Sequence, residues 1–560
     1  MSGAGSLSGT KTDMAVNVYE PGCHLLCHDD VIGSRRVSYI LYLTDPETPW
    51  KESWGGALRL YPTKEKITSD GKKLKIPHYE WSKSIPPAWN QLSFFAVQPG
   101  ESFHDVEEVY KREPSVKEDD GGRVRMAISG WFHIPQEGEE GYEPGLEEKL
   151  AERSSLQQLQ GKNDAFDLPQ PQWRGYDDHK AEHKDVEDDE EGDLTEQDLE
   201  FLLKFLTPHY LTPETVEELS DLFAEESSLQ LANILSKKFS AKLHAEITSK
   251  DQATGKESKQ WQVATPPHKH RYMFQQPKGK TGKKQKAKAN GAAEEGAHDA
   301  LLNDFLPSLA FKKWLSLATG LTLGRRNILA RRFRKALDYT LATAHEDDDA
   351  ELEFCLNVTP SKGWGADEQV EDKEETDSTK PAKADSNGDT KANGKTNGEH
   401  KEEEPDNIGG YELYMAGDDD DDDDDDGSDH GVEIPSGASN PSATGAGNRR
   451  PAKQKKADPA IYQASANDED DGILFSNPAS WNTMSVVLRD KGTLKFVKYV
   501  SKAAQGDRWD LVGSMEVLDD DDDDDDENDE EGEDKDGKKA SEKEHADDAE
   551  VEEEWNGFSD

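Results

Sequence analysis

Uninterrupted runs of aspartate divide this chain into stretches that can fold and stretches that cannot. The runs at 418–426 and 519–526 repel themselves and have no apolar surface to bury, so we expect disorder there. Of the 560 residues, 33% are charged and 32% are hydrophobic. This composition leaves apolar material for roughly two folded domains.

The charge of the chain allows two interpretations. The net charge is −52, and the acidic runs either attract basic proteins such as ribosomal proteins or histones, or act only as solvated inserts. Basic clusters at 278–288 and 449–456 are either nuclear import signals or local counter-charges. Three cysteines and the lack of a long apolar run favour a reducing compartment without a membrane segment. We therefore expect a protein of the nucleus and cytoplasm that does not bind nucleic acid directly.

The two halves of the chain share motifs in the same order. Three pairs recur: Trp89-Asn90 with Trp481-Asn482, Gly55-Gly56 with Gly409-Gly410, and 125–130 with 508–513. Each lies in or beside a run with the alternating pattern of a β-strand. We expect two copies of one β-fold.

His28-Asp29-Asp30, at the end of an apolar stretch, has the spacing of a metal-binding pair. Side chains at i and i+2 of a strand share a face, so His28 and Asp30 can offer an imidazole and a carboxylate to one ion. His104, in a later strand-like run, is a candidate third ligand. Two histidines and one carboxylate that leave coordination positions open form the facial triad of non-haem Fe(II) oxygenases.

Arg125 begins a further strand-like run, and its guanidinium can pair with a carboxylate through two hydrogen bonds. An isolated His-x-Asp in an Asp-rich chain is often only a solvated turn. His104 and Arg125, following in this order, favour instead an iron-dependent dioxygenase that uses 2-oxoglutarate.

The segments around these residues carry a more specific signal. They are LCHDD at 26–30, RRVSYILYL at 35–43, WGGALRLY at 54–61, WN at 89–90, SFH at 102–104 and ISGWF at 128–132. Together they resemble the ribosomal prolyl hydroxylases, a eukaryotic family that hydroxylates a proline of a small-subunit ribosomal protein. The resemblance implies an α+β, mainly β fold. It comprises two double-stranded β-helix (jelly-roll or cupin-like) domains with supporting helices and long disordered acidic inserts.

The resemblance also implies roles for individual residues. Three side chains would hold Fe(II): His28, Asp30 and His104. Arg125 would bind the far carboxylate of the cosubstrate 2-oxoglutarate, helped by Tyr19, Tyr42 and Ser129, and ascorbate would be the reductant. Ordinary strand packing is the alternative for both tyrosines, and Trp131 is expected to be a core or pocket-wall residue. We expect no catalytic residue beyond the metal centre.

The second copy is expected to be inactive. Where the first copy has Phe103-His104 we align Phe496-Val497, and valine cannot bind iron. His345-Glu346-Asp347 would be the remnant of the metal pair. The predicted organisation is a catalytic domain at 1–140, a linker at 141–194, a non-catalytic domain at 195–518 and an acidic tail at 519–560. Disordered inserts are predicted near 276–298, 365–407 and 417–470.

Local signals place several further elements. Thr195 and Asp198 form a capping box before a helix, and Pro213 is a first helical residue. A third helix should run from about Asn303 to Gly320, and residues 490–492 suggest a hairpin. Family members have helices before the region that begins here near residue 12. We therefore expect an N-terminally truncated chain with one sheet face uncovered.

Two functions follow from these patterns. The first is hydroxylation of a prolyl residue in a small-subunit ribosomal protein, with a regulatory protein as a further partner of the second domain. The alternative is an oxygen-sensing regulatory or scaffold protein that uses a dioxygenase fold to bind a basic partner or to control transcription-factor turnover.

Overall fold

The computed structural model describes ten stretches of the chain. They are residues 5–67, 73–112, 121–151, 154, 166–176, 193–252, 260–278, 296–364, 408–416 and 472–518. All belong to the unit Met1–Leu518. The acidic runs, the acidic tail, the basic cluster 449–456 and nearly all of the predicted inserts lie outside the described residues. No described helix has the length and apolar character needed to cross a membrane.

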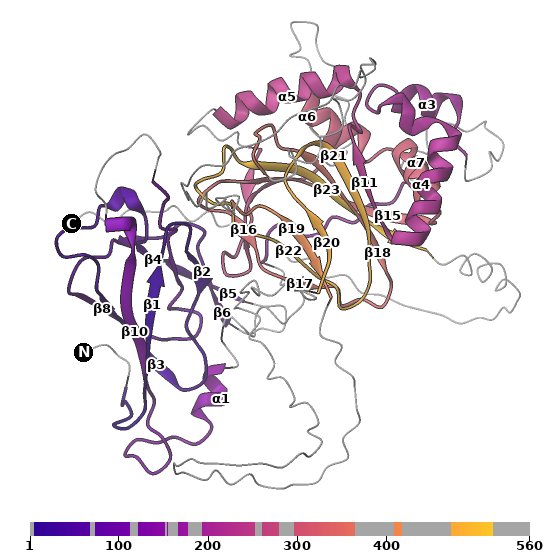
Figure 1. The fold of residues 1–560 in the computed structure, drawn as a ribbon. Coiled ribbons are helices and arrows are strands. Elements are labelled where there is room, and N and C mark those ends of the chain that lie inside the picture. Colours follow the sequence, from indigo (N-terminus) through magenta and orange to yellow (C-terminus); the bar gives the residue numbers. More distant parts are fainter. Residues whose placement is uncertain are drawn as a thin grey trace, which may run out of the picture. The chain divides into compact units, whose positions relative to one another are not determined.

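The first lobe, residues 12–133, consists of antiparallel strands (Figure 1). Its strands are β1 (Thr12–Tyr19), β2 (Leu25–His28), β3 (Arg35–Tyr42), β4 (Leu58–Leu60), β5 (Thr63–Ile67), β6 (Lys73–Pro77), β7 (Lys83–Ile85), β8 (Gln91–Ala96), β9 (His104–Val106) and β10 (Arg125–His133). One sheet has the order β1-β10-β3-β8, another has the order β2-β9-β4-β7, and β5 pairs with β6. Short 3-10 turns lie at Glu52–Trp54 and Gly121–Arg123, and helix α1 (Leu146–Ala151) follows.

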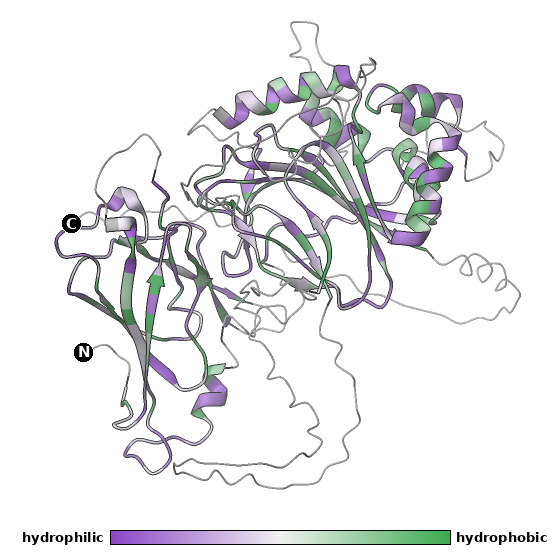
Figure 2. Cartoon of the chain, viewed as in Figure 1, coloured by the Kyte–Doolittle hydropathy of each residue, from purple (hydrophilic) through white to green (hydrophobic). Residues whose placement is uncertain are grey.

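One face of the β1-β10-β3-β8 sheet is apolar and exposed. Met14, Val16 and Val18 alternate along β1 and are 72%, 64% and 51% exposed, and Phe94 on β8 is 65% exposed. In Figure 2, hydrophobic and hydrophilic residues both occur along β1 and β10 of this sheet.

The second lobe, residues 193–518, is larger. Its strands are β11 (Ser228–Ala232), β12 (Gln262–Val263), β13 (His270–Arg271), β14 (Met273–Gln275), β15 (Leu323–Phe333), β16 (Tyr339–Thr340), β17 (Thr343–Ala344), β18 (Glu351–Val358), β19 (Glu412–Met415), β20 (Ile473–Asn477), β21 (Trp481–Arg489), β22 (Leu494–Val497) and β23 (Arg508–Val517). They form a seven-stranded sheet β11-β21-β18-β23-β15-β14-β12, a sheet β17-β22-β19-β20 and the pair β13-β16.

Helices accompany the seven-stranded sheet (Figure 1). They are α3 (Glu196–Leu202), α4 (Pro213–Glu226), α5 (Lys237–Gln252), α6 (Ala297–Ala300) and α7 (Leu309–Thr319), with a 3-10 turn at Pro208–Leu211 and a π-helical turn at Leu301–Phe305. Helices and sheet share one hydrophobic core that includes Phe223, Trp314 and Trp509. The capping box of Thr195 and the first-turn position of Pro213 are confirmed.

The second lobe repeats the strand order of the first. The order β15-β23-β18-β21 corresponds to β1-β10-β3-β8, and β17-β22-β19-β20 corresponds to β2-β9-β4-β7. Asn90 and Asn482, which precede or begin equivalent strands, both have left-handed backbones, with φ of 56° and 57°. The predicted duplication is therefore confirmed in the topology.

Three local predictions were wrong or incomplete. Residues 490–492 do not close a hairpin, because β21 and β22 belong to different sheets and the turn carries the chain from one to the other. The helix that ends at Gly320 begins at Leu309 rather than near Asn303, since Ser308 caps it. Within the predicted linker, Leu168 and Arg174 pair with Thr265 and Arg326 of the second lobe.

Candidate iron and cosubstrate site

The structure brings His28, Asp30 and His104 together. His28 Nε2 lies 3.2 Å from Asp30 Oδ1, and His104 Nε2 lies 3.5 Å from Asp30 Oδ2. One ligand atom from each residue falls within 4.8 Å of the other two. The two histidines are direct partners across β2 and β9, which sets their rings side by side at a centroid separation of 4.3 Å.

Asp30 reaches the site for a reason that strand alternation does not provide. Strand β2 ends at His28, and Asp30 has a left-handed backbone with φ of 62°. The predicted ligand is thus in place, but the i, i+2 strand argument for it was wrong. A turn just past the strand end directs the carboxylate toward the two imidazoles.

The backbone orients both imidazoles. His28 Nδ1 lies 2.8 Å from the Leu26 carbonyl, and His104 Nδ1 lies 2.7 Å from the Ser102 carbonyl. A carbonyl only accepts, so each Nδ1 carries a proton, and in the neutral ring Nε2 keeps the lone pair. This tautomer is the one that a metal ligand requires.

Asp30 is held as an anion. Burial alone would raise the pKa of its carboxyl, but the imidazoles of His104 and His28 outweigh burial and keep the pKa well below its usual range. Burial, and then the charge of His28, lowers the pKa of His104 to about 4. One carboxylate beside a neutral imidazole is a donor set suited to a divalent cation.

Trp131 contributes more than the pocket wall that the sequence suggested. Its indole Nε1 donates to Asp30 Oδ2 over 3.2 Å, and the Arg35 guanidinium lies 3.6 Å from its ring centroid. Trp131 therefore fixes the carboxylate that would bind the metal. Trp131 lies on the same strand face as Arg125, six residues earlier, and this spacing was the sequence signal that could have placed it at the site.

Arg125 is buried, and no carboxylate among the described residues pairs with it. It is 2% exposed, and its Nε donates to the Gly56 carbonyl over 2.7 Å. Its Nη2 and the neighbouring Tyr42 hydroxyl are both buried, and neither has a hydrogen-bond partner of normal geometry among the described residues. A guanidinium in this state fits a carboxylate, and the far carboxylate of 2-oxoglutarate meets that requirement.

The other predicted cosubstrate residues lie near Arg125 to different degrees. Tyr19 and Tyr42 flank its guanidinium, with ring centroids 4.8 and 5.1 Å from its central carbon. Ser129 is on the same strand, but its hydroxyl already accepts a hydrogen bond from Asn17 Nδ2. The tyrosines thus border the expected position of the carboxylate, whereas Ser129 has a partner within the protein.

The equivalent place in the second lobe holds different residues. His104 pairs with Leu60 and with His28 in the first lobe, whereas Lys495 pairs with Tyr414 and with Thr343 in the second. Because Gly56 and Gly410 precede Leu60 and Tyr414 by four residues each, Lys495 is the counterpart of His104. Our alignment of Val497 with His104 was therefore wrong by two residues.

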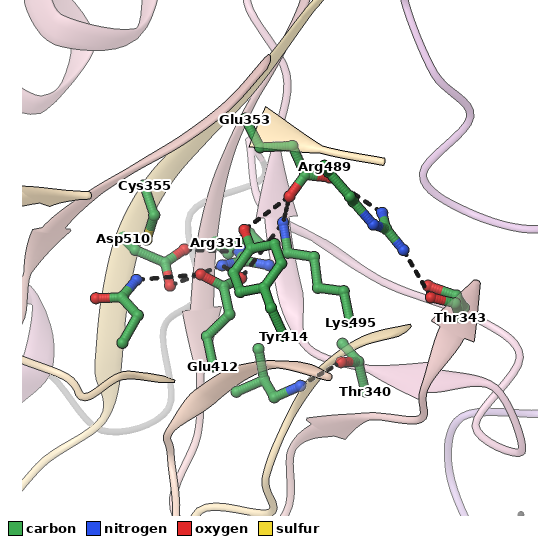
Figure 3. A network of polar contacts seen from close by, with 12 residues as sticks. Arg331, Thr340, Thr343, Glu353, Cys355, Glu412, Tyr414, Arg489, Lys495 and Asp510 are labelled. Carbon is green, nitrogen blue, oxygen red and sulfur yellow. Dashed lines mark hydrogen bonds and ion pairs between the residues drawn. The ribbon is translucent and has the colours of Figure 1, made fainter. Parts of the chain in front are cut away.

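A buried network of charges fills this part of the second lobe (Figure 3). Lys495 donates to Glu353 Oε2 over 2.6 Å, and Arg331 pairs with both Glu412 and Asp510 at 2.9 and 2.7 Å. His345, the predicted remnant of a metal pair, instead has its Nε2 2.8 Å from the Asp349 carbonyl. Among the described residues, only the cluster at His28 has the arrangement of a metal site.

These features define a class. A cluster of two histidines and one carboxylate, together with a buried arginine able to bind a carboxylate, characterises the Fe(II)- and 2-oxoglutarate-dependent oxygenases. The chain belongs to the family whose model is described as "Oxoglutarate and iron-dependent oxygenase degradation C-term", which matches residues 197–524. Residues 14–133 match the 2OG-Fe(II) oxygenase superfamily.

Curated relatives agree with this family. Prolyl 3,4-dihydroxylase OGFOD1 of Ostreococcus tauri is 27% identical over 527 residues, which are 91% of this chain and 79% of the relative. Prolyl 3-hydroxylase OGFOD1 of Mus musculus is 40% identical over 123 residues, 22% of this chain and 18% of the relative. The Xenopus laevis protein of the same name is 42% identical over 109 residues, 20% of this chain and 17% of the relative. The mouse and frog matches thus each span less than a fifth of those proteins.

Proposed function

We propose that this protein is a prolyl hydroxylase that uses Fe(II) and 2-oxoglutarate and modifies a small-subunit ribosomal protein. The observation that carries the activity is a His-Asp-His cluster together with a buried arginine, Arg125, whose Nη2 has no hydrogen-bond partner among the described residues. The relatives that match this chain are named prolyl hydroxylases. The ribosomal substrate rests on the resemblance of the segments between residues 26 and 132.

Each residue has a role in this proposal. The metal ligands are His28, Asp30 and His104, and Trp131 holds the Asp30 carboxylate in position. Arg125 binds the far carboxylate of 2-oxoglutarate between the rings of Tyr19 and Tyr42. Bound together with oxygen, iron and 2-oxoglutarate supply an oxidant strong enough to hydroxylate a C–H bond, with succinate and carbon dioxide as products. The protein supplies geometry and excludes water.

We further propose that each lobe is a double-stranded β-helix. Two four-stranded antiparallel arrangements with matching strand order in both lobes support this architecture. The nucleus and cytoplasm are the proposed locations, with the basic clusters at 278–288 and 449–456 as nuclear import signals. Ascorbate as reductant remains a prediction.

Mass spectrometry tests the activity and the substrate together. The chain is incubated with Fe(II), ascorbate, 2-oxoglutarate and proline-containing peptides of a decoding-centre ribosomal protein. We expect a gain of one or two oxygens on a proline, and no gain with His104→Ala. Succinate formation without peptide oxidation would keep the oxygenase and reject the ribosomal substrate.

A second candidate function is regulation of protein turnover. The description of the family model that matches residues 197–524 includes the word "degradation". The second lobe also has a charge network where the first has its metal cluster. A scaffold of this kind would keep its function in the His104→Ala variant. Loss of the cellular function in that variant would reject a pure scaffold.

A further inference from the structure

A buried carboxylate, Glu108, joins the two lobes. Its side chain is fully buried and accepts three hydrogen bonds from one short segment of the second lobe. Ser501 Oγ donates over 2.5 Å, the Lys502 backbone N–H over 2.8 Å and the Tyr499 hydroxyl over 3.3 Å. Hydrogen bonds to a charged acceptor are among the stronger ones in proteins, so this contact fixes Glu108 firmly.

The backbone of Glu108 in turn holds Gly55 and Gly56. The Gly56 N–H donates to the Glu108 carbonyl over 3.1 Å. A Cβ on Gly55 would lie 2.0 Å from that same oxygen, and both glycines have φ near +73°, so no other residue fits this crossing. Any shift of Glu108 is therefore passed directly to Gly56.

Gly56 leads to the cosubstrate arginine. Its carbonyl accepts the hydrogen bond from Arg125 Nε over 2.7 Å, and a Cβ on Gly56 would lie 3.1 Å from Arg125 Cδ. This hydrogen bond orients the guanidinium, whose Nη2 is left for a ligand. The direction of the guanidinium thus depends on where the Gly56 carbonyl lies.

The same arrangement recurs in the second lobe. A Cβ on Gly409 would lie 1.8 Å from the Tyr499 carbonyl, and Arg508 Nη1 donates to the Gly410 carbonyl. Glu108 and Tyr499 therefore occupy equivalent positions in the two lobes, and their side chains contact each other.

We infer that Glu108 is a positioning residue through which the Tyr499–Lys502 segment of the second lobe orients Arg125 for 2-oxoglutarate. This inference rests on the proposed function, because it presupposes that Arg125 binds the cosubstrate. It gives the second lobe a part in the reaction without any ligand of its own. The contacts lead from Glu108 to Gly56 and Arg125 rather than to the metal ligands, so cosubstrate binding should respond more than metal binding.

The test is the affinity for 2-oxoglutarate measured by calorimetry on the full chain loaded with Mn(II), which binds without turnover. Ser501→Ala removes one donor to Glu108 from the far side of the contact and touches neither the metal cluster nor Arg125. Its matched control is Thr359→Val, which deletes a buried hydroxyl of the same lobe that donates to the Trp509 carbonyl. Glu108→Gln is the second variant, and melting temperature and Mn(II) affinity are recorded for all four proteins.

We expect Ser501→Ala to weaken 2-oxoglutarate binding by about three- to tenfold, the loss of one charge-assisted hydrogen bond. Glu108→Gln should weaken it at least as much, because its amide N–H₂ faces donors. Mn(II) affinity should be unchanged in both variants, and Thr359→Val should bind 2-oxoglutarate as the wild type does. With active enzyme, the KM for 2-oxoglutarate should rise more than kcat falls.

Two results would overturn the inference while the proposed function stands. One is wild-type 2-oxoglutarate affinity in both Ser501→Ala and Glu108→Gln. The other is an equal loss in Thr359→Val, which would show general destabilisation. If the wild-type chain with Mn(II) does not bind 2-oxoglutarate at all, the inference and the proposed cosubstrate are both overturned.

Discussion

Asp510 occupies in the second lobe the strand position that Ala127 occupies in the first. Each lies two residues after the buried arginine that begins the last strand, Arg508 or Arg125. Asp510 Oδ2 accepts a hydrogen bond from Arg508 Nε over 2.9 Å, so this arginine has a carboxylate from its own chain. At Ala127 no carboxylate exists, and Arg125 retains a free Nη2 for the cosubstrate.

Ala127→Asp should therefore convert the first lobe toward the second. The new carboxylate would pair with Arg125, as Asp510 pairs with Arg508, and would compete with 2-oxoglutarate for the guanidinium. We expect the affinity for 2-oxoglutarate, measured by calorimetry with Mn(II), to fall by roughly a hundredfold or more. This corresponds to the loss of the charge-assisted pair between Arg125 and the cosubstrate carboxylate. The Ala127→Asn variant controls for size, and an equal loss there would attribute the effect to crowding.

Two substitutions of Asp30 should affect metal binding equally but the stability of the fold differently. Its backbone has φ of 62°, where alanine is strained by about 1 kcal/mol and glycine is not. Asp30→Ala and Asp30→Gly should both lose Mn(II) binding, since both lack the carboxylate. Asp30→Gly should be the more stable of the two by about 1 kcal/mol in urea denaturation. Measurable Mn(II) binding by either variant would contradict the assignment of Asp30 as a ligand.

Trp131→Phe keeps an aromatic ring but removes the N–H that donates to Asp30 Oδ2. Loss of such an outer hydrogen bond usually weakens metal binding by about 10- to 100-fold. We expect weaker Mn(II) binding of that order, with a melting temperature close to that of the wild type. Unchanged affinity would mean that Trp131 is only a wall of the site.

The charge network of the second lobe should be essential to its stability. Asp510 is 1% exposed and pairs with both Arg331 and Arg508. Asp510→Asn leaves these guanidinium groups short of a counter-charge, which costs about 3–5 kcal/mol in a buried setting. Glu516, on the same strand as Asp510, forms an exposed pair with Arg325 of β15, and Glu516→Gln should cost less than about 1 kcal/mol. Urea denaturation compares them, and similar losses would contradict the role of burial.

His298 should make the chain sensitive to acid. Burial, and then the charge of Lys250, lowers the pKa of His298 to about 4, against about 6.5 in an unfolded chain. Between these values the unfolded state binds more protons, so stability is lost as the pH falls from 6.5 toward 4. The loss is at most about 3 kcal/mol. The melting temperature of His298→Gln should depend less on pH over this range than that of the wild type. Parallel profiles of melting temperature against pH would contradict the prediction.

The candidate site could be predicted largely from local sequence. His28, His104 and Arg125 stand at the ends of runs whose alternating pattern already marks them as strands. The mainly β character and the duplicated motifs also followed from such patterns. Residue type and spacing within one strand are properties of the chain alone, because the backbone geometry of a strand fixes which side chains share a face.

Relationships between strands were decided only by the tertiary structure. The alignment that placed Val497 opposite His104 failed because register depends on which strands pair, and that pairing placed Lys495 there instead. The left-handed turn at Asp30, the indole contact of Trp131 and the junction of Glu108 with Ser501 depend equally on residues distant in the chain. The sequence by itself determined which chemical groups this protein has for holding a metal and a carboxylate. The packing of its two lobes decided how those groups are oriented, since hydrogen bonds between distant segments cannot be read from spacing along one of them.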